Sequence, residues 1–283
     1  MRRAVGTALF ALLAFAANSV LCRMALRRSH IDPVSFTTVR LLAGALTLWV
    51  LVRASRREGG TTGGNWLSAA ALLGYAIPFS LAYVGLTAGT GALLLFGAVQ
   101  VVMLSAGFMA GERANRWVVV GWLLAIAGLI WLLLPGLSAP PTRDAAFMLI
   151  AGVAWGIYSL RGRRSADAVA DTAGNFLRST PGALLISVLL HAQRTADLQG
   201  IVLAALSGSV ASGLGYAAWY TALPSLGAIA AANAQLTVPV IAALAGVVLF
   251  NEPITARLVI SSVLVLAGTA IAVRQSFPAR ARL

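Results

Sequence analysis

Lysine is absent from this sequence, and acidic residues are scarce. All 21 basic residues are arginine, eight residues are aspartate or glutamate, and the net charge is +13 at pH 7. The phosphate-binding loop of ATP-driven motors requires a lysine, so the chain cannot be its own ATP motor. Nucleic-acid binders gather basic residues on one face, whereas these arginines sit between apolar runs, so we expect no nucleic-acid partner.

Cysteine and histidine are almost missing as well. The single cysteine, Cys22, cannot form an internal disulfide, and with His30 and His191 it is too widely spaced to build a metal site. An intramembrane serine protease would need a histidine inside a helix, yet both histidines fall in predicted joints. We therefore expect no enzyme activity, no metal and no cofactor.

Charged side chains of any kind are few, and apolar ones dominate. Charged residues make up 10% of the 283 positions and hydrophobic residues 59%, and the mean hydropathy is +0.88. A spanning helix needs about 20 apolar residues, and many such runs follow one another here with short polar joints between them. The composition predicts an all-α integral membrane protein that has the lipid bilayer as a partner.

Ten apolar runs can be separated by their charged or proline- and glycine-containing joints. They cover residues 5–26, 34–52, 66–88, 91–110, 117–134, 145–160, 168–190, 200–222, 228–249 and 256–273. The seventh run is the most polar, because it carries Asp171, Asn175 and Arg178. We expect its neighbours to shield it from lipid, or part of it to be wet.

The first run allows two interpretations. Arg2 and Arg3, the apolar stretch to Phe15 and the Ala14-Phe15-Ala16 triplet resemble a secretory signal with a cleavage site. Apolar residues nevertheless continue to Leu26, which is longer than a signal core. We therefore favour an uncleaved first helix.

The arginines are shared unevenly between alternate joints. With the N-terminus in the cytoplasm, thirteen of them fall in inner joints and five in outer joints. The outer ones are Arg27, Arg28, Arg143, Arg194 and Arg257. Because cytoplasmic joints of membrane proteins are enriched in basic residues, we predict a protein of the inner (plasma) membrane with both termini in the cytoplasm. This orientation requires an even number of spans.

The two halves of the chain, residues 1–138 and 139–283, resemble each other. Matched pairs are Arg40 with Arg178, Tyr83 with Tyr220 and Glu112 with Glu252, at separations of 138, 137 and 140 residues. Five helices per half is an odd number, so the second repeat is inverted relative to the first. Inverted repeats in secondary transporters enclose a solute site near mid-depth, and we expect such a site here.

Aromatic side chains recur along the third and eighth runs. Tyr75, Phe79 and Tyr83 share one helix face because they are four residues apart, and their repeat partners include Tyr216 and Tyr220. Two such stripes would line opposite walls of a cavity for an amphipathic solute. Plain packing, or anchoring at the membrane interface, is the alternative explanation.

Polar side chains in other apolar runs complete the predicted binding site. They are Asn18, Ser19, Gln100, Trp155, Tyr158, Asn233 and Gln235. Amides in hydrocarbon need partners, and a neutral site built from them could hold the amino and carboxylate groups of a zwitterion. Hydrogen bonding between helices would explain each of them equally well.

Four charged residues near helix ends are expected to be structural. Arg40 and Arg178 lie about two turns inside their helices, close enough to extend toward the headgroups, although a role in binding a carboxylate is an alternative. Glu112 and Glu252 precede helix starts and are interpreted as caps. No acidic residue falls near the middle of a run, which favours transport without strong ion coupling.

Several short motifs give the chain its resemblance to a known family. Asp32-Pro33 leads into the helix of Arg40, Gly111-Glu112-Arg113 ends the fourth run, Trp155-Gly156-Ile157-Tyr158 lies in the sixth, and Asn251-Glu252-Pro253 follows the ninth. In order and spacing the chain resembles EamA-type members of the drug/metabolite transporter superfamily over its whole length. Val99 departs from the pattern, since many relatives have proline there, whereas its repeat partner Pro239 is present.

The resemblance implies a secondary transporter with a small-molecule solute. The branch that looks most similar exports aromatic and other neutral amino acids, which makes these the expected solutes, moved by alternating access at a central cavity. A proton-coupled drug/metabolite antiporter is the main alternative, while a membrane enzyme and a non-transporting scaffold are weaker ones. The oligomeric state cannot be read from the sequence.

Overall fold

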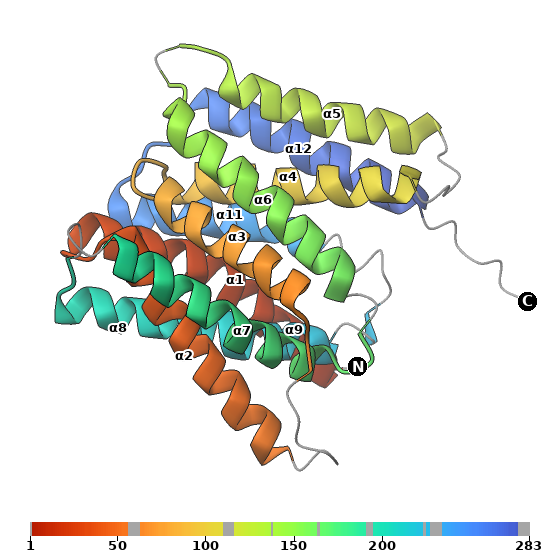
Figure 1. Cartoon of the computed structure of the whole chain (residues 1–283). Coiled ribbons are helices and arrows are strands. Elements are labelled where there is room, and N and C mark those ends of the chain that lie inside the picture. Colours follow the sequence, from red (N-terminus) through yellow and green to blue (C-terminus); the bar gives the residue numbers. More distant parts are fainter. Residues whose placement is uncertain are drawn as a thin grey trace, which may run out of the picture.

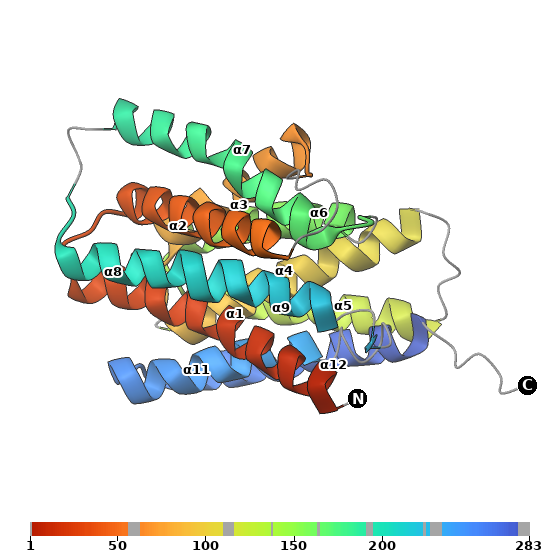
Figure 2. The ribbon, with the colours of Figure 1, turned by 90° about the horizontal axis from the view of Figure 1, so that it is seen from below.

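In a computed structural model of the chain, nearly all the described residues are helical. The structure describes residues 2–55, 63–109, 116–136, 138–162, 165–190, 195–222, 225–226 and 234–276. No β-strand occurs in these ranges. Long helices run side by side along one common direction and form a bundle (Figures 1 and 2).

The helices follow the ten predicted runs. They are α1 (Arg2–Arg28), α2 (Pro33–Ala54), α3 (Trp66–Ala82), α4 (Ala88–Met109), α5 (Arg116–Leu133), α6 (Thr142–Gly162), α7 (Ala168–Leu189), α8 (Leu198–Leu206), η2 (Ser207–Leu214), α9 (Gly215–Ala222), α11 (Thr237–Phe250) and α12 (Ala256–Ser276). The elements α8, η2 and α9 join without a break into one rod, whose middle segment η2 is a π-helix. The described residues therefore form ten rods.

The predicted end of the third run differs most from the structure. The third run was expected to continue to residue 88, but α3 ends at Ala82 because the chain turns back toward α4, which Thr87 caps by accepting from the amide of Thr90. The ninth run was expected to begin at residue 228, which lies outside the described residues, and α11 begins at Thr237.

Several of the few acidic and amide side chains start helices. Asp32 accepts hydrogen bonds from the amides of Val34 and Ser35, both at 2.9 Å, and so caps α2. Asn65, Asp167 and Asp197 cap α3, α7 and α8 in the same way. These oxygens satisfy amides that have no partner inside the helix, and they fix where each rod begins.

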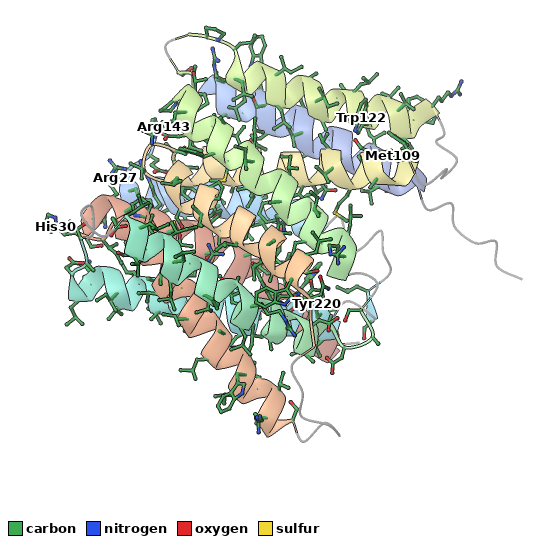
Figure 3. The ribbon with its side chains drawn as sticks, in the orientation of Figure 1. Arg27, His30, Met109, Trp122, Arg143 and Tyr220 are labelled. Carbon is green, nitrogen blue, oxygen red and sulfur yellow. The ribbon has the colours of Figure 1, made fainter. Side chains whose placement is uncertain are left out.

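The bundle has two distinct ends. The first turn of α1 and the last turn of α12 lie at the same end, which we call the terminal end; the opposite one is the far end (Figures 1 and 2). Arg27, His30 and Arg143 lie at the far end, whereas Tyr220 lies toward the terminal end (Figure 3). The placement of these two helix ends on one side agrees with the predicted even number of crossings (Figures 1 and 2).

The outer surface of the bundle is apolar. Within the described residues, seven helices or joined rods are long and apolar enough to cross a membrane, and α3 and α11 are shorter apolar helices. Large apolar side chains such as Leu198 and Val248 are 77% and 78% exposed, which water would disfavour and lipid tolerates. The polar helix α7 is covered on one side by α2 and on another by α3. The chain is a multi-pass membrane protein.

Contacts between helices repeat in a regular pattern. When the first five rods are matched in order to the last five, α2 packs on its counterpart α7, α4 on α11, and α5 on α12. The contact of α3 with α6 has its counterpart in that of α9 with α1, and the contact of α4 with α6 in that of α11 with α1. The two halves thus make equivalent contacts with each other.

A glycine in η2 allows α2 to approach the rod closely. A Cβ added at Gly208 would collide with the backbone carbonyl oxygen of Arg40 and would lie 2.9 Å from the Cβ of Ala43. Backbone cannot move aside as easily as the end of a flexible side chain. Small residues at such crossings are typical of helix packing in membranes.

Gly208→Ala is therefore expected to destabilise the protein by about 1–3 kcal/mol, the usual cost of overpacking. The measurement is the thermal unfolding midpoint of purified protein in mild detergent. Gly6→Ala is the matched control, because an added Cβ there meets no atom within 4 Å. Equal midpoints for the two variants would show that α2 and η2 are not in close contact.

Candidate functional site

A buried arginine lies at the centre of the bundle. Arg40 is only 1% exposed, and its Nη2 donates to the hydroxyl of Tyr75 at 2.9 Å while its Nε donates to Ser212 Oγ at 3.3 Å. The expectation that Arg40 extends toward the headgroups is wrong. The helix that carries it is covered by α7 and by η2, so the side chain points into the protein.

Aromatic rings from three rods meet beside this arginine. The ring centroid of Trp155 on α6 lies 4.8 Å from that of Tyr75 on α3, 5.0 Å from that of Tyr216 on α9 and 5.3 Å from that of Tyr158. We call these four residues the aromatic cluster. Phe79 extends it, with its ring 5.3 Å from Tyr75. Residues far apart in the sequence, predicted on separate grounds, are thus brought together.

Asn18 joins the cluster to the first helix. Its amide nitrogen donates to the hydroxyl of Tyr75 at 3.1 Å, and its amide oxygen accepts from Ser207 Oγ at 2.6 Å. A polar chain therefore runs from Ser207 through Asn18 and Tyr75 to Arg40 and Ser212. All of these residues are buried, so the bonds form in a setting of low dielectric constant.

Of the other predicted residues, those that the structure describes are not part of the aromatic cluster. Tyr83 and Ser19 are buried toward the far end, where Ser19 hydrogen-bonds to Tyr83 and the ring of Tyr83 packs on Phe79. Gln100 is buried on α4, Gln235 is half-buried just before α11, and Asn233 lies outside the described residues. Tyr220 lies at the terminal end and lines a cavity there.

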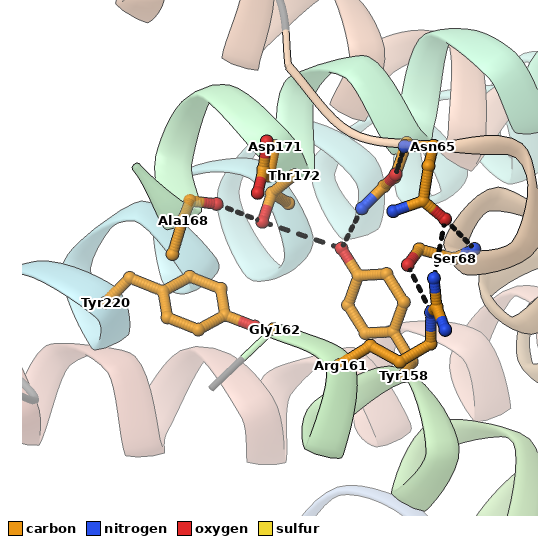
Figure 4. A pocket seen from close by; sticks show the side chains of 10 residues that line it. Asn65, Ser68, Tyr158, Arg161, Gly162, Ala168, Asp171, Thr172 and Tyr220 are labelled. Atoms are coloured by element: carbon orange, nitrogen blue, oxygen red, sulfur yellow. Dashed lines mark hydrogen bonds between the residues drawn. The ribbon is translucent and has the colours of Figure 1, made fainter. Parts of the chain in front are cut away.

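This cavity of about 30 Å³ is large enough for a water molecule (Figure 4). Its lining includes Asn65, Tyr158, Arg161, Asp171 and Tyr220. Tyr158 is shared with the aromatic cluster, where its ring stacks on that of Trp155. Tyr158 therefore contacts both the cavity and the aromatic cluster.

A short segment before α3 covers α7 at the terminal end. The amide of Gly64 donates to Asp171 at 2.7 Å, the amide of Asn65 donates to the side chain of Asn175 at 2.9 Å, and Arg178 donates to the carbonyl of Gly63. We call residues 63–65 the strap. The strap satisfies polar groups that made the seventh predicted run the most polar.

Arg161 holds the strap from the other side. Its guanidinium donates to Ser68 at 2.8 Å and to the side-chain oxygen of Asn65 at 2.9 Å. Asn65, Arg161 and Ser68 are not among the site residues predicted from the sequence. The polar positions of α7 were the only available signal, since they implied a partner without identifying it.

A buried ion pair lies at the far end. Glu252 is 6% exposed; its carboxylate accepts from Arg23 Nε at 3.1 Å and from the amide of Ala88 at 2.8 Å. The predicted cap at Glu252 is corrected in one respect, because the carboxylate caps α4 rather than the helix that follows it. Left-handed Asn251, with φ of 53°, turns the chain so that the carboxylate reaches inward. Glu112 lies outside the described residues.

Comparison with known proteins finds the same family twice along the chain. The profile of the EamA-like transporter family matches residues 2–134 and again residues 143–274. These two matches cover nearly the whole sequence and coincide with the two halves that make equivalent contacts.

Individual proteins are also similar to much of the chain. A Pseudomonas aeruginosa protein described as uncharacterized is 53% identical over 270 residues, which cover 95% of this chain and 94% of that protein. An uncharacterized transporter of Archaeoglobus fulgidus is 29% identical over 71% of this chain and 73% of its own length. A solved crystal structure of 18% identity covers 96% of this chain and 98% of its own, with a TM-score of 0.68, and shares the fold.

Proposed function

Because this chain belongs to the EamA-like transporter family, we propose that it exports a small amphipathic solute through the centre of its bundle. Aromatic and other neutral amino acids are the first candidates. The observation that carries the proposal is the aromatic cluster around Trp155, which adjoins the polar chain of Asn18, Tyr75 and Arg40. Such a site offers flat apolar surfaces and a few fixed polar groups to one molecule.

We propose alternating access between two inverted five-helix repeats as the mechanism. The equivalent contacts of the two halves support it, as does the family match to each half. The strap at the terminal end and the pair of Arg23 with Glu252 at the far end would serve as the two closures. Opening one closure while the other holds would expose the centre to one side only.

The direct test is counterflow in proteoliposomes against a panel of amino acids. Proteoliposomes that contain the purified protein and are preloaded with an unlabelled aromatic amino acid are expected to accumulate the labelled one. Protein-free liposomes loaded in the same way are not. Accumulation is expected without a pH gradient, since the proposal includes no strong ion coupling. Uptake that departs from equilibrium only under a pH gradient would instead favour the proton-coupled antiporter, and absence of any flux would reject transport of this class.

The proposed orientation places the terminal end in the cytoplasm, with the inner membrane as the location. Ser55 follows α2 at the terminal end and Ser138 follows α5 at the far end, and both are exposed. In a background lacking Cys22, Ser138→Cys is expected to react with a membrane-impermeant maleimide on intact cells. Ser55→Cys is expected to react only after the cells are permeabilised, and the reverse pattern would invert the orientation.

A further inference from the structure

We infer that Arg40 binds the carboxylate of the solute, and that the solute needs no amino group. The inference rests on the proposed transport function and narrows its substrate class to carboxylates with an aromatic or apolar body. It starts from one nitrogen: Arg40 Nη1 is buried and has no hydrogen-bond partner among the described residues. The other two guanidinium nitrogens are bonded to Tyr75 and Ser212.

The environment of Arg40 is uncharged. Its guanidinium lies 5.2 Å from the ring centroid of Tyr75 and 4.9 Å from that of Phe79, and the hydroxyls of Tyr75 and Ser212 accept its hydrogen bonds. The ion pairs found in the described part of the chain use Arg23 and Arg27 instead. Ring faces and hydroxyls offset only part of the cost of burying a full positive charge.

A solute carboxylate would supply the negative charge that this environment lacks. Guanidinium and carboxylate groups form short charge-assisted hydrogen bonds, and Nη1 has its donors unused. The pair of guanidinium and solute carboxylate would be neutral overall, which lowers the free-energy cost of holding either charge within the hydrocarbon. A permanent structural anchor, by contrast, would be expected to use every donor within the protein.

The position of the rings determines which kind of group is attached to the solute carboxylate. Tyr75 contacts both Arg40 and Trp155, so a carboxylate at Nη1 places the attached body against the aromatic cluster. In the structure these rings touch one another, and a bound solute would replace ring-to-ring contacts with ring-to-solute contacts. The side chains that hold Arg40 carry no negative charge, so none of them can form an ion pair with an ammonium group.

The test compares four molecules with one phenyl skeleton in the counterflow assay. Phenylalanine and 3-phenylpropionate carry the carboxylate, whereas phenylalaninamide and 3-phenylpropanol do not. We expect 3-phenylpropionate to inhibit labelled-phenylalanine flux at least as strongly as phenylalanine itself, and the two molecules without a carboxylate to be at least about tenfold weaker. Equal inhibition by 3-phenylpropionate and 3-phenylpropanol would overturn the inference while leaving transport intact; absence of flux for every aromatic amino acid would overturn the proposed function.

Variants of Arg40 locate the effect. Arg40→Gln is expected to lower labelled-phenylalanine flux at least about tenfold, because phenylalanine carries the carboxylate, while Arg40→Lys should recover part of the loss by keeping the charge. If the variants do not fold, binding to the wild-type protein decides. There, 3-phenylpropionate is expected to raise the unfolding midpoint in detergent more than 3-phenylpropanol does, and equal shifts would refute the inference.

Discussion

Trp155→Ala is expected to lower solute flux at least about tenfold while the protein still inserts into the membrane. The ring of Trp155 contacts those of Tyr75, Tyr158 and Tyr216, at centroid distances of 4.8–5.3 Å. Each aromatic contact is worth about 0.5–1.5 kcal/mol beyond the area it buries, and tenfold in flux corresponds to about 1.4 kcal/mol. Loss of the indole therefore removes the shared wall of the proposed site.

The measurement is initial counterflow of the amino acid that the wild-type protein transports best. Trp131→Ala is the matched control, because Trp131 lies on α5, is 43% exposed and faces the outside of the bundle. It is expected to retain nearly full flux. Wild-type flux in Trp155→Ala, at equal protein in the membrane, would remove the aromatic cluster from the transport pathway.

Glu252→Gln is expected to destabilise the protein by about 3–5 kcal/mol, the usual cost of leaving one member of a buried ion pair without its partner. The side chains of Arg23 and Glu252 are only 10% and 5% exposed, so water screens the remaining charge poorly. The same change weakens the cap on the amide of Ala88. The unfolding midpoint in mild detergent should fall clearly. The Ser138→Cys variant, changed at an exposed position, serves as the control and should keep the wild-type midpoint.

A double-mutant cycle separates the ion pair from other effects. Combining Arg23→Gln with Glu252→Gln removes both charges at once, so the double variant should be more stable than the sum of the two single losses predicts. Strictly additive losses would mean that the two side chains do not interact in the folded protein.

Much of the fold could be predicted because lipid imposes simple rules on a sequence. A run such as residues 34–52 has to be helical, since every backbone group in hydrocarbon must be bonded within its own segment. Its start was also readable, because Asp32 is placed to cap the helix that Pro33 opens. Helix ends that depend on tertiary contacts, such as the early end of α3 at Ala82, have no comparable capping residue in the sequence that would predict them.

Residues of the candidate site could be predicted to lie together only where their spacing places them on one face of a helix. Tyr75 and Phe79 share a face by spacing alone, and the structure brings them beside Arg40. Arg40 itself was misplaced, because its depth was judged from its distance along the helix rather than from the rods that surround it. The strap escaped prediction for a related reason, since its backbone amides carry no side-chain signature and meet Asp171 only in three dimensions.

The π segment Ser207–Leu214 changes the angular phase of the rod that contains it. Its hydrogen bonds reach one residue further than those of an α-helix, so each of its turns holds more residues. Residues beyond Leu214 consequently point along different azimuths than an uninterrupted α-helix from Leu198 would give them. The direction in which Tyr216 points therefore depends on the number of residues per turn in the preceding π segment. Deleting a single residue from that segment would rotate Tyr216 away from its neighbours without altering its chemistry.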